Sequence, residues 1–105
     1  MNDRDIYTID EIKEKLHHIF EAEPIFTAIL FGSYANGEAT INSDIDIVID
    51  SHRQLLNMNF YGVLNDISEL LGKKVDLIEA AEIKDDSFLF EEVNVKGVLL
   101  YERKG

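Results

Sequence analysis

Two aspartates, Asp44 and Asp46, stand two positions apart, and the first follows Ser33 of a Gly-Ser step by eleven residues. In an extended strand, residues i and i+2 share a face, so both carboxylates point to one place. Two carboxylates about 5 Å apart repel each other by roughly 3 kcal/mol at an effective dielectric near 20. A divalent cation between them removes that repulsion, and an all-oxygen ligand set suits Mg²⁺ or Mn²⁺. The spacing therefore predicts a metal site at Asp44 and Asp46.

A third carboxylate, Asp76, interrupts a run that is otherwise apolar, between Val75 and Leu77. If its strand neighbours that of Asp44 and Asp46, three carboxylates meet, which is enough to hold two metal ions about 4 Å apart. Two such ions can activate an attacking oxygen and stabilise a leaving pyrophosphate. The alternative interpretation of Asp76 is a satisfied residue at the end of a strand.

The Gly-Ser step supplies the features of a phosphate site. Gly32 lets the backbone approach a ligand, and Ser33 with the amides after it can open a short helix whose N–H groups hold phosphate. We expect nucleotide binding at Gly32, Ser33 and Ser43, although Ser43 can also be interpreted as the cap of a turn. Tyr34, inside the loop, either gates the nucleotide or packs. Strand, phosphate loop and aspartate pair together suit a nucleoside triphosphate.

The flanking sequence predicts the elements that position these residues. Thr8 and Glu11 have the spacing of a capping box, Pro24 stops the helix that they begin, and Gly72 ends a second helix. Apolar periodicity predicts helices over 8–23, 54–71 and 85–95, and strands over 25–31, 43–50, 73–80 and 97–102. This order predicts an α+β fold, a small mixed β-sheet packed against helices. The first two strands should pair antiparallel, because the loop between them is too short for a crossover helix.

Composition bounds the remaining possibilities. The length of 105 residues predicts a single domain, 1–105, and 46% apolar with 30% charged residues is typical of a globular chain. The chain contains no cysteine, which excludes disulfides and cysteine-bound zinc. A net charge of −11 with scattered cations argues against a long nucleic acid as partner. Because the start does not resemble a secretory signal and the apolar run 25–31 is too short for a membrane span, we expect a cytoplasmic protein.

The chain resembles the minimal nucleotidyltransferases of the DNA polymerase β superfamily. The resemblance lies in Gly32-Ser33, then, after ten intervening residues, Asp44-Ile45-Asp46, followed by a helix and a strand that contains Asp76. The resemblance covers nearly the whole chain and is closest to the antitoxins encoded beside a HEPN-domain toxin. It implies that Asp44, Asp46 and Asp76 bind two Mg²⁺ ions, that the Gly-Ser loop binds the triphosphate of ATP, and that the third aspartate helps to activate the acceptor hydroxyl. It also implies transfer of AMP from ATP to a tyrosine of the HEPN-type toxin.

One position departs from the family pattern. The family loop usually reads Gly-Ser-x-Ala-Arg-Gly, whereas this chain reads "GSYANG", with Asn36 where the arginine falls. Asparagine cannot supply the positive charge of that arginine. Asn36 and the few cations favour an alternative, a binding module that neutralises its partner by masking. A second alternative is transfer to a small-molecule hydroxyl, as in the aminoglycoside nucleotidyltransferases, which normally carry an additional domain.

Overall fold

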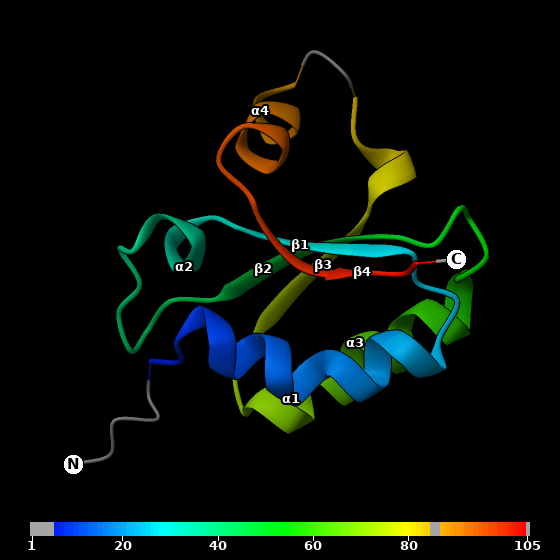
Figure 1. Cartoon of the computed structure of the whole chain (residues 1–105), viewed down its shortest axis with the longest axis horizontal. Coiled ribbons are helices and arrows are strands. Elements are labelled where there is room, and N and C mark those ends of the chain that lie inside the picture. Colours follow the sequence, from blue (N-terminus) through cyan, green and yellow to red (C-terminus); the bar gives the residue numbers. More distant parts are fainter. Residues whose placement is uncertain (1–5, 85–86, 105) are drawn as a thin grey trace.

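The computed structural model describes residues 6–84 and 87–104 (Figure 1). In chain order the elements within these residues are α1 (Ile9–Ala22), β1 (Thr27–Phe31), α2 (Ser33–Asn36), β2 (Ile45–Asp50), α3 (Asn57–Leu71), β3 (Val75–Glu79), the 3-10 helix η2 (Ala80–Glu82), α4 (Phe88–Asn94) and β4 (Val98–Glu102). Among them, no helix is both long and apolar enough to cross a bilayer.

The strands form one mixed sheet in the order β3-β2-β1-β4. β1 pairs antiparallel with β2 and with β4, whereas β2 and β3 run parallel. The antiparallel pairing expected across the Gly-Ser loop is therefore confirmed. α3 makes the longer connection that two parallel strands require, and the predicted α+β fold with a mixed sheet is confirmed as well.

Helices cover both faces of the sheet, with α1 and α3 on one face and α4 with η2 on the other (Figure 1). The alternation in β2 sets which side chains each layer receives. Ile45, Ile47 and Ile49 are fully buried in the larger core, with α1 and α3. Val48 points the other way and joins Phe31 and Val93 in a smaller core. Asp46 alternates onto this second side, so β2 presents its carboxylate away from the main core.

Local signals determine where the two long helices begin and end. The predicted capping box is present, because Thr8 Oγ1 accepts from the Glu11 N–H and the Glu11 side chain accepts from the Thr8 N–H. Gly72 adopts the left-handed conformation that ends α3. α3 begins at Asn57 rather than near residue 54, because a turn closed by the Ser51 backbone and side chain takes up the N–H groups of Gln54 and Leu55.

The last predicted helix, 85–95, corresponds to α4 at Phe88–Asn94. Residues 85 and 86 of that prediction lie outside the described residues. Ser87 caps α4, since its Oγ accepts from the Phe90 N–H.

Candidate active site

Asp46 and Asp76 lie side by side across the parallel pair β2–β3, where their Cα atoms are register partners. Both border a hollow of about 360 Å³ that is lined by Phe31, Asp46, Leu64, Val75, Asp76, Leu77 and Ile78. Asp76 is exposed, whereas Asp46 is mostly covered. The sheet thus brings together two carboxylates that are thirty residues apart in the sequence.

The surroundings of Asp46 disfavour its charged form. The pKa of this carboxyl is raised from 3.8 to about 6, first by burial, then by a hydrogen bond and like charge from Asp76, and last by the charge of Asp44. A cation placed among these groups would relieve both the repulsion and the lost hydration. The oxygen-only donor set therefore fits a divalent metal ion.

Asp44 directly precedes β2 and has a cationic neighbour of its own. Its Oδ2 atom lies 3.7 Å from Nζ of Lys74, the residue directly before β3. Across residues 6–84 and 87–104, no three His, Cys, Asp or Glu side chains are placed to share one ion. The structure pairs Asp46 with Asp76 and leaves Asp44 beside Lys74, so joint metal binding by all three stays a prediction.

Gly32 brings the loop after β1 against Asp46. Its φ of +75° lies in the left-handed region, and a Cβ at this position would collide with Oδ2 of Asp46. Phe31, the residue before it, is the register partner of Asp46 across β1–β2. A glycine is required both by the backbone angle and by the approach of the carboxylate.

The expected short helix after Gly32 is α2, which Gly37 ends in the left-handed conformation. The N–H groups of Ala35 and Asn36 bond to the Gly32 carbonyl, whereas those of Ser33 and Tyr34 belong to the first turn and have no partner within the helix. Two backbone donors therefore follow Gly32, the residue that packs against Asp46.

Ser43 serves a turn. Its Oγ accepts from the Thr40 N–H at 2.8 Å, and its own N–H donates to the Thr40 carbonyl at 3.0 Å. This arrangement corresponds to the alternative interpretation given to Ser43, and its phosphate contact stays a prediction. Lys73 supports the same loop by donating to the Ile41 carbonyl at 3.1 Å.

Tyr34 packs into the main core and is only 5% exposed. Its hydroxyl is buried and, among the described residues, has no hydrogen-bond partner. Packing, one of the two interpretations of this residue, is therefore what the structure shows. Asn36, the last residue of α2, is exposed.

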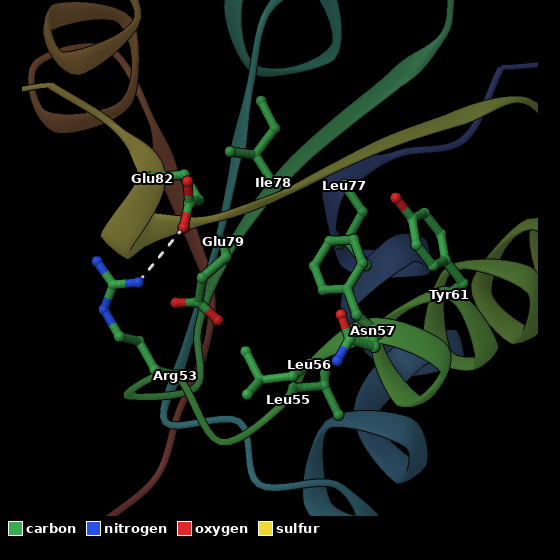
Figure 2. Close-up of a pocket in the computed structure, with 10 residues that line it drawn as sticks. Arg53, Leu55, Leu56, Asn57, Tyr61, Leu77, Ile78, Glu79 and Glu82 are labelled. Atoms are coloured by element: carbon green, nitrogen blue, oxygen red, sulfur yellow. Dashed lines mark hydrogen bonds and ion pairs between the residues drawn. The ribbon is translucent and has the colours of Figure 1, made fainter.

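A second hollow, of about 320 Å³, opens between β3 and the start of α3, and sequence reasoning missed it (Figure 2). It is lined by Arg53, Leu55, Leu56, Asn57, Phe60, Tyr61, Leu77, Ile78, Glu79 and Glu82. Glu79 is buried and accepts hydrogen bonds from the N–H and hydroxyl of Ser51. One signal was available in the sequence, because Glu79 continues the alternating face of Val75 and Leu77, where a carboxylate is out of place.

Known proteins resemble this chain in sequence and in fold. Residues 14–105 match the family model "Polymerase beta, Nucleotidyltransferase". "Putative protein adenylyltransferase MJ0128" from Methanocaldococcus jannaschii is 37% identical over 82 residues, which cover 74% of this chain and 84% of the relative.

Solved toxin–antitoxin structures are among those that share the fold. A chain from the crystal structure of a toxin-antitoxin with AMP-PNP superposes with a TM-score of 0.75 at 24% identity, covering 88% of this chain and 74% of that chain. A chain from a tri-AMPylated Shewanella oneidensis HEPN toxin in complex with MNT antitoxin gives a TM-score of 0.70 at 20% identity, covering 91% and 74%.

Proposed function

Because this chain belongs to the polymerase β nucleotidyltransferase family, we propose that it transfers AMP from ATP to a hydroxyl group of a partner protein. The resemblance inferred from Gly32-Ser33 and the Asp44-Ile45-Asp46 motif is confirmed by the family match. The protein is an enzyme of the protein adenylyltransferase type, as its relative in Methanocaldococcus jannaschii is named.

The observation that carries the proposal is the packing of Gly32 against Asp46, which is itself paired with Asp76. Phosphate-binding backbone and metal-binding carboxylates must be adjacent if one triphosphate is to touch both. These three residues come from separate elements, and the fold places them at one end of the sheet.

Asp44, Asp46 and Asp76 would hold two Mg²⁺ ions. When bound, such ions increase the acidity of an attacking hydroxyl and stabilise charge on a leaving pyrophosphate. Lys74 lies beside Asp44 and would have to release it for this purpose. A divalent ion competes well here, because the ion pair of Lys74 and Asp44 is partly exposed and weak.

The other steps belong to side chains and backbone of this chain. The N–H groups of Ser33 and Tyr34, in the first turn of α2, would bind phosphate oxygens and orient the α-phosphorus. Asp76, the more exposed carboxylate, would accept the proton of the acceptor hydroxyl. The hydroxyl oxygen then bonds to the α-phosphorus, the bond from this phosphorus to the bridging oxygen of pyrophosphate breaks, and pyrophosphate leaves.

We assign the acceptor to a tyrosine of a HEPN-type toxin encoded by a neighbouring gene, so that the protein acts as an antitoxin. Support comes from the two structural neighbours, a toxin-antitoxin with AMP-PNP and an AMPylated HEPN toxin with its MNT antitoxin. The residues of the site are compatible with this acceptor, because the roles proposed for Asp46 and Asp76 require only a hydroxyl group.

The test is incubation of the protein with ATP labelled at the α-phosphate, Mg²⁺ and the protein encoded next door. We expect label on the partner, loss of label with EDTA, and loss when the acceptor tyrosine is changed to phenylalanine. Asp46→Asn should reduce labelling by at least 100-fold, because the metal site loses a ligand. Asp66→Asn, which removes the same charge from an exposed position on α3, should label normally.

Asn36 provides the observation that favours a second function, masking without transfer. It is the exposed last residue of α2, at the position where the family loop usually has an arginine, so this loop lacks one cation for the triphosphate. Tight binding of the toxin without label would establish masking and contradict the transfer that we propose. Neutralisation that survives Asp46→Asn would lead to the same conclusion.

A further inference from the structure

β3 is an edge strand, and one side of its backbone has no strand partner within the described residues. The Ile45 N–H donates to the Lys74 carbonyl at 3.0 Å, and Ile45 is in register with Val75. In a parallel pair alternate residues bond to the neighbouring strand, so Lys74, Asp76 and Ile78 face β2. The N–H and C=O groups of Leu77 and Glu79 therefore point outward.

Two hollows lie along this open edge and share Leu77 and Ile78 as lining residues. The first contains Asp46 and Asp76, and the second contains Arg53, Leu56 and Tyr61. Each is lined by side chains from both faces of the sheet, and Figure 2 shows Leu77 and Ile78 on opposite sides of the β3 ribbon. The hollows therefore flank β3 from the carboxylate pair to the end of the strand, although the side chains of Leu77 and Glu79 themselves are buried.

The second hollow, named here the Arg53–Tyr61 hollow after two of its lining residues, combines an apolar floor with an acidic rim. Leu56 is 55% exposed and Tyr61 is 66% exposed, so both offer apolar surface at the hollow. Arg53 lies 3.4 Å from Glu82 in an exposed ion pair, which is weak (Figure 2). Glu79 adds another carboxylate to the lining.

The loop that shapes this hollow is held in an unfavourable conformation. His52 and Arg53 in this loop have φ values of +52° and +61°, and Asn57 at the start of α3 has +53°; such values are uncommon for residues other than glycine. Buried Glu79 fixes the loop through its hydrogen bonds with Ser51. Such strain persists when the surrounding structure over-determines it, as it does at ligand-binding sites.

We infer that the open edge of β3 binds an extended segment of the acceptor protein as an added strand, with an apolar side chain of that segment in the Arg53–Tyr61 hollow. The inference rests on the proposed function, because the acceptor hydroxyl must then reach Asp76. An extended backbone satisfies the outward groups of Leu77 and Glu79, and pockets for its side chains supply specificity. Asp76 and the α3 side of the hollow lie on opposite faces of the sheet, so the apolar side chain must be an odd number of residues from the acceptor. At about 3.3 Å per residue, a spacing of three residues is roughly 10 Å.

Charge identifies the occupant as a basic polypeptide rather than a second phosphate group. Three carboxylates, those of Asp76, Glu79 and Glu82, border the edge together with one cation, Arg53, so negative charge is in excess. The whole chain carries a net charge of −11. Lysine or arginine residues beside the acceptor would therefore be attracted, whereas a nucleotide phosphate in the Arg53–Tyr61 hollow would be repelled.

The first experiment measures transfer to nine-residue peptides with one central tyrosine, flanking lysines, and leucine or glycine three residues after the tyrosine. With wild-type protein, the leucine peptide should have a KM at least tenfold lower than the glycine peptide. Tyr61→Ala should remove this difference, because it removes the wall that contacts leucine, and the KM for ATP should not change. Met58→Ala is the matched control, since Met58 is 86% exposed at the start of the same helix but does not line the hollow.

The second experiment uses hydrogen exchange and does not depend on transfer. With Mg²⁺ and the non-hydrolysable analogue AMP-PNP, the leucine peptide should slow amide exchange at Leu77 and Glu79 by at least tenfold. Unchanged exchange at both amides overturns the inference, as does a Tyr61→Ala variant that raises the KM for ATP instead of that for peptide. Protection of both amides without transfer to any peptide supports the docking site and contradicts the proposed function.

Discussion

Asp46 illustrates at the residue scale how a carboxylate of the candidate site affects folding. It is mostly covered, in register with Asp76, and has a pKa of about 6 against 3.8 outside this environment. The folded protein holds this proton more tightly than the unfolded chain. The stabilising contribution of the carboxyl is therefore fully present below pH about 4, and it is lost as the pH rises through about 6.

The corresponding prediction is that Asp46→Asn stabilises the metal-free protein at neutral pH. A shift of this size corresponds to about 3 kcal/mol, which partial solvation reduces to about 1–2 kcal/mol at pH 7.5. The gain should nearly vanish at pH 4, where the wild-type carboxyl is protonated in the folded state. Urea unfolding in EDTA at both pH values measures it, and exposed Asp66→Asn should show no such pH dependence. A variant less stable than wild type at pH 7.5 would mean that the carboxylate is structural.

At the scale of elements, Arg103 connects the end of β4 to the end of α1. Its Nε donates to the Ile25 carbonyl at 3.1 Å, and one terminal nitrogen lies 3.0–3.2 Å from the carbonyls of Phe20, Glu21 and Glu23. The last carbonyls of a helix lack partners within the helix and carry partial negative charge. Arg103 satisfies several of them at once and aligns α1 with the sheet.

We expect Arg103→Ala to lower the free energy of unfolding by about 1–3 kcal/mol, because charged hydrogen bonds to the end of α1 are lost. Arg103→Lys should recover only part of that loss, since one ammonium group cannot reach the same set of carbonyls. The adjacent, exposed Lys104→Ala should change stability by less than about 0.5 kcal/mol. Chemical denaturation measures all three variants. Equal stability of the alanine and wild-type proteins would show that the cap contributes little.

At the scale of the whole molecule, the candidate site joins three parts of the chain that are distant in sequence. Gly32 follows β1, Asp46 lies in β2, and Asp76 lies in β3. A ligand that contacts all three parts binds the folded protein but not the unfolded chain, and it therefore stabilises the fold. Mg²⁺ and ATP should act together, since the metal neutralises the carboxylates that would otherwise repel the triphosphate.

The prediction at this scale is a melting temperature that Mg²⁺ plus ATP raises more than either alone. At a ligand concentration about one hundred times Kd the gain is about 2.7 kcal/mol, or on the order of 10 °C for a chain of this size. Gly32→Ala should abolish the joint effect, because its methyl group collides with Asp46.

Gly37→Ala is the control for the melting experiment, with a similar φ of +77° but nothing within 4 Å of the added carbon. It should lose about 1 kcal/mol of stability from the left-handed backbone and keep the joint effect. Equal stabilisation by Mg²⁺ with and without ATP would leave an ion site only.

Signals that act within a few residues were sufficient to predict many of the helices and strands of this protein from the sequence alone. Thr8 and Glu11 begin α1, Gly72 ends α3, and the alternation from Ile45 to Ile49 assigns the two faces of β2. The short connection between β1 and β2 determines their antiparallel pairing, because no crossover helix fits. The Gly-Ser and Asp-x-Asp motifs indicated the family in the same way.

Tertiary structure alone decided which distant groups meet. Asp76 pairs with Asp46 because α3 connects β2 to β3 so that the two strands lie side by side and parallel. The spacing in the sequence did not determine which strand would neighbour β2. Lys74 beside Asp44 and Arg103 at the end of α1 are contacts of the same kind, since packing brings their partners from other elements. For Ser43 the sequence allowed both the cap of a turn and a phosphate contact, and the structure shows a hydrogen bond with nearby Thr40. Side chains that can serve several partners are assigned by the partner that packing brings within reach.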